Sequence, residues 1–314
     1  MSDSDYATLV VCLNPAVELT YWFESFSGEQ QTATEMQVEA GGKGTNVARL
    51  LTSLGHRNVL ATSCCGLFSE IMARTLEAES VETLYSPVGA DTRASLVLIT
   101  AENLEPLIVR TDGEDLVGSD AEQLESWVLR TITSGKWNAL VLSGSVPPGL
   151  GSNIYGRLVA AASEAGLNAI VDAGGDLLAG ALSAMPFLVK PNEREACSAL
   201  GYEIGGVSPE RLARELGQSA RIAIVTCGPE GAWVCSGDST YRVKSSPVLG
   251  RNGAGAGDAY CAEVVRAVTE GCEIDEMLVR AAVMGASAVN APGSGRLPQV
   301  LPDPVSLGVS VESL

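Results

Sequence analysis

The amino-acid sequence predicts an α/β fold: a doubly wound, mainly parallel β-sheet with a small β-sheet lid. Short, continuously apolar segments alternate with longer amphipathic segments along most of the chain. This alternation is typical of a parallel sheet with helices on both faces. Clusters of glycine and polar residues follow several of the apolar segments. Because ligands bind beyond the carboxyl ends of the strands in such sheets, these clusters are the candidate functional loops.

The expected elements follow one another in a regular order. The first strand, 7–13, is almost entirely apolar and ends at Asn14-Pro15, a pair that breaks a strand. A glycine turn that begins at Gly41 opens a helix whose apolar residues lie on one face. Further strands are expected at 58–63, 139–142, 168–172, 187–190, 222–226 and within 231–243. Further helices are expected at 68–78, 119–134, 152–165, 174–182, 192–200, 209–217, 259–268 and from about 275 to 290.

Two early segments, roughly 17–40 and 92–111, alternate polar and apolar residues instead. That pattern is typical of a small, half-exposed sheet. No linker, repeat or low-complexity tract divides the chain, so we expect a single domain over residues 1–314 with these two segments as its lid. Because a small amphipathic sheet is not stable alone in water, we expect the lid to close over a substrate and to be able to pair with a second subunit in a homodimer.

The composition limits the classes of partner and the compartment. The formal net charge of −18 argues against nucleic acids and anionic membranes, because both attract basic patches. No apolar run approaches the length of a membrane span, and the N-terminus lacks the basic start of a signal peptide. The eight cysteines include no C-x-x-C pair, which favours free thiols in a reducing cytoplasm over disulfides or a zinc site.

The stretch 252–258, Asn-Gly-Ala-Gly-Ala-Gly-Asp, is the strongest candidate for chemistry. Its alternating glycines let successive backbone N–H groups point the same way, and the following helix adds unpaired N–H groups and partial positive charge. Together they predict an anion-binding loop at Gly255, Ala256 and Gly257. Asp258 beside it can take a proton from a hydroxyl, which is what phosphoryl transfer requires. The alternative is a flexible turn before a helix with an acid in its first turn.

The chain resembles the PfkB, or ribokinase-like, carbohydrate kinases over nearly its full length. The stretches 41–49 and 252–258 look like the two signatures of that family. Residues 189–195 are similar to its Asn-x-x-Glu motif and 225–231 to the turn after its nucleotide-binding strand. The sugar-phosphate branch of the family contains 1-phosphofructokinase, tagatose-6-phosphate kinase and one type of 6-phosphofructokinase. The stretches that resemble this branch are 13–16, 92–93 and 142–149.

This resemblance implies ATP as the phosphoryl donor, Mg²⁺ as a cofactor, and a role for each of several residues. Asp258 would be the general base, with the anion hole at Gly255, Ala256 and Gly257. Asn192 and Glu195 would place Mg²⁺, directly or through water. The residues implied to bind the nucleotide are Lys190, Asn192, Thr226, Gly228, Gly231, Gly255, Gly257 and Asn290. Those implied to bind the sugar are Glu18, Gly41, Gly42, Lys43, Asn46, Arg93, Ser143 and Asp258.

Simpler interpretations exist for several of these residues. Asn192 and Glu195 have the spacing of a helix capping box. Lys43 and Arg93 are the cations expected to hold a phosphate on the sugar, but surface lysines and arginines are usually only solvated.

Three departures from the family pattern affect the expected substrate. Glu18 stands where the family usually has Asp, Gly253 replaces a Thr in the second signature, and Ser95 stands where the sugar-phosphate branch often has Asn. The leading hypothesis is ATP-dependent phosphorylation of fructose 1-phosphate, fructose 6-phosphate or tagatose 6-phosphate. A kinase for a free sugar or nucleoside, and a catalytically weak sugar-binding regulatory protein, are the alternatives.

Overall fold

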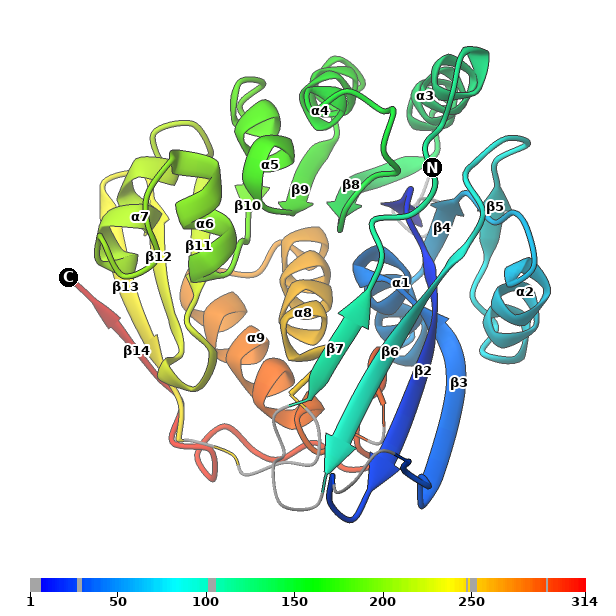
Figure 1. The fold of residues 1–314 in the computed structure, drawn as a ribbon. Helices are drawn as coiled ribbons and strands as arrows, with labels where there is room; N and C mark the ends of the chain where they lie inside the picture. The colour runs from blue at the N-terminus through cyan, green and yellow to red at the C-terminus, as the bar shows by residue number, and fades with distance from the viewer. Residues whose placement is uncertain (1–6, 27–29, 101–105, 247, 249–252, 292) are drawn as a thin grey trace.

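The structure is a computed structural model that describes residues 7–26, 30–100, 106–246, 248, 253–291 and 293–314. A large sheet runs through the centre with helices on both faces, and a smaller sheet lies beside it (Figure 1). Within the described residues the large sheet contains ten strands. From one edge to the other they are β14 (Ser310–Ser313), β13 (Ser239–Lys244), β12 (Ala232–Ser236), β11 (Ile222–Thr226), β10 (Leu188–Val189), β9 (Asn168–Asp172), β8 (Trp137–Ser143), β1 (Ala7–Cys12), β4 (Asn58–Thr62) and β5 (Thr83–Tyr85).

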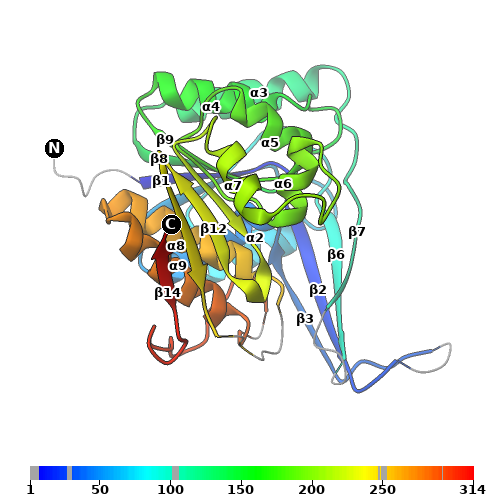
Figure 2. The ribbon, with the colours of Figure 1, turned by 90° about the vertical axis from the view of Figure 1, so that its left-hand side faces the viewer.

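Helices cover the two faces of this sheet as two groups, which Figure 2 shows from the side. One face carries α3 (Ser119–Ile132), α4 (Ile154–Glu164), α5 (Gly175–Leu182), α6 (Glu193–Leu200) and α7 (Pro209–Leu216). The other carries α1 (Lys43–Ser53), α2 (Ser69–Ala78), α8 (Ala256–Glu270) and α9 (Ile274–Ala288). A short 3₁₀ turn, η2 (Gly228–Glu230), follows β11.

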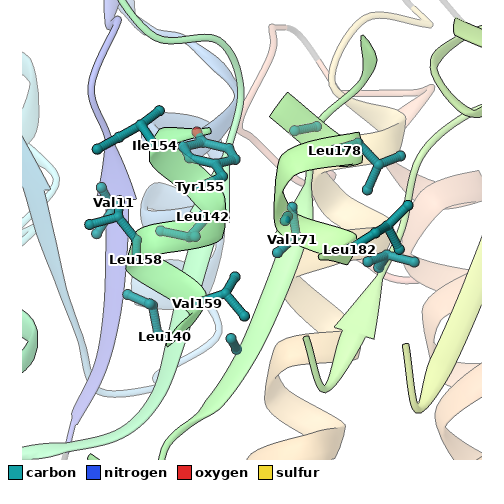
Figure 3. Close-up of a cluster of buried hydrophobic side chains, with 14 of the residues drawn as sticks. Val11, Leu140, Leu142, Ile154, Tyr155, Leu158, Val159, Val171, Leu178 and Leu182 are labelled. Atoms are coloured by element: carbon teal, nitrogen blue, oxygen red, sulfur yellow. The ribbon is translucent and has the colours of Figure 1, made fainter. Parts of the chain in front are cut away.

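Strand β1 shows why the central strands are continuously apolar. All six of its residues are buried. Successive side chains of a strand point to opposite faces, so Val11 packs in the core beneath α3–α7 while Val10 packs beneath α1, α2, α8 and α9. Figure 3 shows Val11 in the first of these cores, together with Leu142 of β8 and Leu158 of α4.

The smaller sheet is the predicted lid, with the strand order β3 (Glu35–Gly41), β2 (Ala16–Phe23), β6 (Arg93–Thr100), β7 (Leu107–Arg110). Strand β2 pairs antiparallel with β3 and parallel with β6, and β6 pairs antiparallel with β7. Both of its chain segments leave from the carboxyl-terminal side of the large sheet, the first after β1 and the second after β5 (Figure 1). The lid therefore stands over the edge at which ligands are expected.

The expected strands and helices are present, with their ends shifted by a few residues. Two strands of the large sheet were not predicted. β5 has three residues and pairs only with β4, while β14 is the polar and largely exposed sequence Ser-Val-Glu-Ser, so neither has an apolar pattern that marks a strand. The sheet is parallel from β5 to β11 and antiparallel from β11 to β14.

The described part of the chain contains no helix that is both long and apolar enough to cross a bilayer. All eight cysteines are free thiols.

Candidate active site

The predicted anion loop leads into α8 as expected. Asn252 lies outside the described residues. Gly255 is the N-cap of α8 with φ of 86°, and a Cβ on it would lie 3.1 Å from the Cα of Ser294. Left-handed backbone and this close approach both require glycine. The N–H of Ala256 donates to the carbonyl oxygen of Gly253 at 3.5 Å, and the N–H groups that follow it in the first turn of α8 have the arrangement that binds anions.

Asp258 lies in the first turn of α8 and is only 6% exposed. Its Oδ2 accepts a hydrogen bond of 2.8 Å from Nδ2 of Asn46, which fixes the orientation of the carboxyl group. Burial raises the pKa of Asp258 to about 7, and repulsion from Asp172 adds to this, while Lys43, Asn46 and Lys190 oppose it. A carboxylate with a pKa near neutral is well matched to accept a proton at neutral pH.

Two buried groups, Asp172 and Lys190, and two half-buried groups, Lys43 and Glu195, form a charged cluster beside the anion loop. Asp172 ends β9 with no exposed surface, and its Oδ1 lies 3.2 Å from Nζ of Lys43 and 3.3 Å from Nζ of Lys190. Lys43 also contacts Oε1 of Glu195 at 2.5 Å. Burial alone would raise the pKa of Asp172, but Lys190 and Lys43 outweigh it and hold that pKa below its usual value. Four charged groups from α1, β9 and the ends of β10 and α6 thus meet at one point.

The sequence predicted that Lys43 holds the phosphate of the sugar, but in the structure its ammonium group is already paired with other residues. Its ammonium group is neutralised by Asp172 and Glu195, which come from positions 129 and 152 residues away in the chain. Lys190 is placed closer to the expected phosphate site, because a Cβ on Gly257 would lie 3.8 Å from its Nζ. The cluster thus lies beside the start of α8, where the sequence predicts the anion loop.

Asn192 and Glu195 do form a capping box at the start of α6. The Oδ1 of Asn192 accepts a hydrogen bond from the backbone N–H of Glu195 at 2.9 Å, and Glu195 Oε2 accepts one from the N–H of Asn192 at 3.0 Å. The interpretation of Asn192 and Glu195 as a helix capping box is therefore correct. The cap also aims Oε1 of Glu195 at Lys43, so it places a carboxylate inside the charged cluster.

The residues present fit Mg²⁺ held mainly through phosphates and water. Mg²⁺ in kinase sites takes one or two carboxylates together with phosphate oxygens. Glu195 supplies one carboxylate, and Oδ2 of Asp172 is a buried acceptor without a hydrogen-bond partner among the described residues. The residues that the structure describes contain no group of three or more His, Cys, Asp or Glu side chains that could hold a metal ion by itself.

A cavity of about 360 Å³ opens on the other side of the anion loop. This volume is in the range of small-molecule sites. Its walls come from the turn after β11, the strand β13, the anion loop and the small residues of α9. The predicted nucleotide residues Thr226, Gly228, Gly231 and Gly257 line it, whereas the exposed Asn290 does not and Val289 lies there instead.

The opposite side of Asp258 is bounded by α1 and the base of the lid. Gly42, with φ of 99°, is the N-cap of α1, and a Cβ on Gly41 would lie 3.0 Å from Cβ of Glu18. Burial raises the pKa of Glu18, and the neighbouring Glu39 adds to the effect. The Oδ1 of Asn46 and the Oγ of Ser143 are buried without a hydrogen-bond partner among the described residues. Unsatisfied buried polar atoms are costly, so this wall is suited to a ligand with hydroxyl groups.

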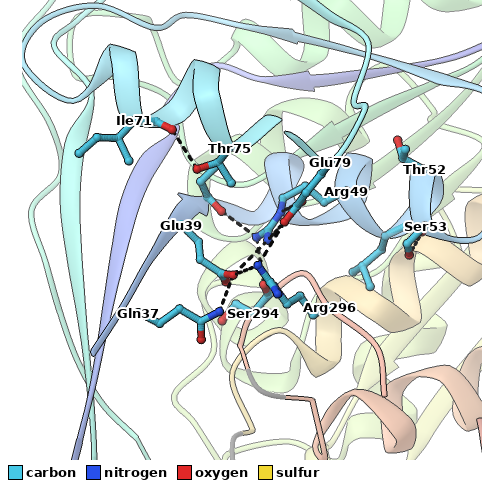
Figure 4. A network of polar contacts seen from close by, with 12 residues as sticks. Gln37, Glu39, Arg49, Thr52, Ser53, Ile71, Thr75, Glu79, Ser294 and Arg296 are labelled. Atoms are coloured by element: carbon cyan, nitrogen blue, oxygen red, sulfur yellow. Dashed lines mark hydrogen bonds and ion pairs between the residues drawn. The ribbon is translucent and has the colours of Figure 1, made fainter. Parts of the chain in front are cut away.

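A charged network, not foreseen from the sequence, ties the lid to this wall (Figure 4). Arg49 of α1 is 1% exposed and donates to both carboxylate oxygens of Glu79, at 2.6 and 2.7 Å. It also donates to the carbonyl oxygens of Ala40, at the base of the lid, and of Ser294, at 2.8 and 3.1 Å. Arg296 pairs with Glu39 of β3. The segment 293–296 is thereby held between the lid, α1 and the anion loop.

Asp172 is a candidate functional residue that the sequence did not predict. It directly follows a continuously apolar strand, the same signal that marked the other functional loops, but no motif surrounds it. Its partners Lys43 and Lys190 come together with it only in the folded chain.

Comparison with known proteins agrees with this geometry. Residues 8–300 match the pfkB family of carbohydrate kinases. The chain belongs to the PfkB family. Among relatives, a tagatose-6-phosphate kinase of Staphylococcus epidermidis is 24% identical over 283 residues, covering 88% of this chain and 90% of the relative. A 1-phosphofructokinase of Xanthomonas campestris is 28% identical over 273 residues, covering 83% of this chain and 84% of the relative.

A crystal structure of Escherichia coli phosphofructokinase-2 in complex with fructose-6-phosphate superposes with a TM-score of 0.77, at 26% identity, covering 90% of this chain and 94% of that one. The predicted ribokinase-like α/β fold with a separate small sheet is confirmed. The protein is a carbohydrate kinase.

Proposed function

We propose that the protein transfers the γ-phosphoryl group of ATP to a hydroxyl of a sugar phosphate, with fructose 1-phosphate, fructose 6-phosphate and tagatose 6-phosphate as the candidate acceptors. The observation that supports this best is the position of Asp258. Its carboxyl group, with a pKa near 7, lies between the cavity lined by Thr226 and Gly228 and the wall formed by Asn46 and Ser143. A base in that position can reach an acceptor hydroxyl while the donor phosphate lies at the start of α8.

In the proposed reaction, Asp258 takes the proton of the acceptor hydroxyl as the oxygen attacks the γ-phosphorus. Asn46 holds the carboxylate oriented through its hydrogen bond of 2.8 Å. The N–H groups at the start of α8 and the ammonium groups of Lys190 and Lys43 stabilise the charge that develops on the phosphoryl oxygens. Mg²⁺, when bound near Glu195 and Asp172, would neutralise charge on the nucleotide phosphates.

The test is ADP formation measured across fructose 1-phosphate, fructose 6-phosphate, tagatose 6-phosphate, fructose and ribose. The proposal predicts that one or more of the sugar phosphates has the highest kcat/KM. A preference for fructose or ribose would show that the acceptor is a free sugar. That second candidate has one observation in its favour: Lys43, expected to hold the sugar's phosphate, is neutralised by two carboxylates.

We also propose that the lid forms a homodimer through its outer face. Cross-strand pairing puts Met36, Leu107 and Val109 on the same face of the lid, and they are 56%, 56% and 48% exposed. A cluster of exposed apolar side chains on a sheet favours burial against another surface. A monomer in light scattering at micromolar concentration would refute the dimer, and Val109→Lys should convert a dimer to a monomer. The free thiols support a reducing compartment such as the cytoplasm.

A further inference from the structure

Arg49 is the most deeply buried charged residue of the network in Figure 4. Each of its three guanidinium nitrogens has a partner. Nε and Nη2 donate to the two carboxylate oxygens of Glu79, the C-cap of α2, while Nη1 donates to the carbonyl oxygens of Ala40 and Ser294. One guanidinium group therefore joins α2, the end of the lid strand β3 and the segment 293–296.

The peptide between Ser294 and Gly295 connects Arg49 to the active site. A Cβ on Gly295 would lie 2.9 Å from Nη1 of Arg49 and 2.8 Å from Oδ1 of Asn46. On its other side, a Cβ on Gly255 would lie 3.2 Å from the backbone nitrogen of Gly295. The peptide thus fills the space between Arg49, the side chain of Asn46 and the N-cap of α8. Because groups packed this closely cannot move independently, a shift of the peptide would also displace Asn46.

Asn46 links this peptide to the proposed base. Its Nδ2 donates to Oδ2 of Asp258 at 2.8 Å, and its buried Oδ1 lies against Gly295. An amide confined on both sides cannot rotate, so its hydrogen bond keeps the carboxyl group of Asp258 in one orientation. Arg49 follows Asn46 by three residues on α1 and therefore lies on the same face of that helix.

Stability alone does not explain the pairing of Arg49 with Glu79. Apolar residues of α1 and α2, among them Leu51 and Met72, already pack in one core. A buried ion pair often adds little stability over apolar side chains of similar volume, because both charges lose their hydration. What the pair adds is geometry: two charge-assisted hydrogen bonds to Glu79 fix the plane of the guanidinium group and direct its third nitrogen at the two backbone carbonyl groups.

We propose that Arg49 is a positioning residue for phosphoryl transfer: by holding the Ser294–Gly295 peptide against Asn46, it keeps that amide where it orients Asp258. The hydrogen bond from Arg49 to Ala40 ties the same peptide to the base of the lid. This inference rests on the proposed role of Asp258 and identifies the residue that holds its orienting group in place.

The experiment measures kcat, and KM for ATP and for the acceptor with the highest kcat/KM, in wild type, Arg49→Lys, Asn46→Ala and the double variant. Lysine keeps the charge but has one nitrogen, so it cannot bind both oxygens of Glu79 and also reach the two carbonyl groups. We expect Arg49→Lys to lower kcat by about 10- to 100-fold and to change each KM by less than about threefold. In the Asn46→Ala background, the same substitution should lower kcat by less than about threefold, because both residues act through one orientation of Asp258.

Arg280→Lys is the matched control. Arg280 also binds two carboxylates, those of Glu263 and Glu270, but these contacts join α9 to α8 and involve neither the lid nor residues 293–296. It should lower the thermal stability as Arg49→Lys does, while kcat stays within about twofold of wild type. Glu79→Gln is the second test variant, because its side chain is 28% exposed and the substitution should not prevent folding. It leaves Arg49 in place with a weaker partner and should lower kcat by a smaller factor.

The outcomes separate this inference from the proposed function. A normal kcat in folded Arg49→Lys, or losses that multiply in the double variant, would overturn the positioning role and leave the proposed function standing. An equal loss of kcat in Arg280→Lys would also overturn it, by showing that destabilisation alone is sufficient. If Arg49→Lys does not fold, an unchanged kcat in Glu79→Gln overturns the role instead. Near-normal turnover by Asp258→Asn would overturn the proposed function itself.

Discussion

The raised pKa of Asp258 predicts opposite effects of ionisation on activity and on stability. The base must be ionised to accept a proton, and its pKa is raised to about 7. The ionised fraction should therefore rise about tenfold between pH 6 and pH 8, and kcat/KM should rise with it. Asp258→Asn keeps the shape but removes the base, so kcat should fall by about 10² or more while nucleotide affinity stays close to wild type.

The same shift makes Asp258 destabilising when it is ionised. Its pKa is raised from an ordinary value of 3.8 to about 7, so the folded protein holds the proton more tightly than the unfolded chain does. The favourable contribution of the protonated form is complete below about pH 4 and is lost as the pH rises through the window from 3.8 to about 7. At pH 8, Asp258→Asn should be more stable than wild type by an amount on the order of a few kcal/mol, with little difference near pH 4.

Asp172→Asn provides the matched control for the cause of the shift. It removes a negative charge that raises the pKa of Asp258 and leaves Lys43 and Lys190, which lower that pKa, without their shared partner. Both changes move the acid limb of the pH profile in the same direction, to lower pH, by about one unit or more. Activity would be measured as ADP release from pH 5.5 to 9, and stability by urea unfolding. A flat profile in wild type, or Asp258→Asn no more stable than wild type at pH 8, would refute the assignment.

Three further predictions concern the surroundings of Asp258. Glu195→Gln should raise the Mg²⁺ concentration needed for half-maximal rate. An unchanged dependence of the rate on Mg²⁺ would show that Glu195 acts only as a helix cap. Gly295→Ala should lower both stability and kcat. Its φ is 68°, and the new Cβ would lie 2.8 Å from Oδ1 of Asn46, whose side chain orients Asp258. Gly201→Ala is the control: its φ is 75° but no atom lies within 4 Å of the new Cβ, so it should cost only about 1–2 kcal/mol of stability. Equal effects of these two glycine substitutions would contradict the packing argument. Glu39→Gln and Arg296→Gln should be non-additive by about 0.5 kcal/mol or more in urea unfolding, and strict additivity would show that their ion pair does not tie the lid to the body.

The sequence predicted the fold well because most of its signals are local. Apolar runs, helix periodicity and glycine turns each specify one element, and the alternation of the two kinds of element implies the parallel sheet. The polar strand β14 has no such signal and was missed. Asp258 could be proposed as the base from the sequence because its glycine loop is contiguous in the chain.

Residues whose role depends on distant partners were harder to predict. Asp172 has no surrounding motif, and its proposed role depends on contacts with two lysines that lie 129 and 18 residues away in the sequence. Lys43 was expected at the sugar for the same reason, since its charge is visible in the sequence but its pairing is not. Arg49 lies in the predicted helix after Gly41, yet only the folded chain brings it to Glu79 and Ser294.

The role of Asp258 as the base that allows this carbohydrate kinase to phosphorylate a sugar phosphate can be tested directly. The most direct measurement is the rate of Mg²⁺-ATP-dependent ADP formation with each candidate sugar phosphate, by wild type and by Asp258→Asn, with the free sugars alongside. We expect turnover of at least one sugar phosphate by wild type and a loss of about 10² or more in Asp258→Asn. Near-normal turnover by Asp258→Asn, or no phosphorylation of any sugar phosphate by a wild-type protein that phosphorylates a free sugar, would contradict it.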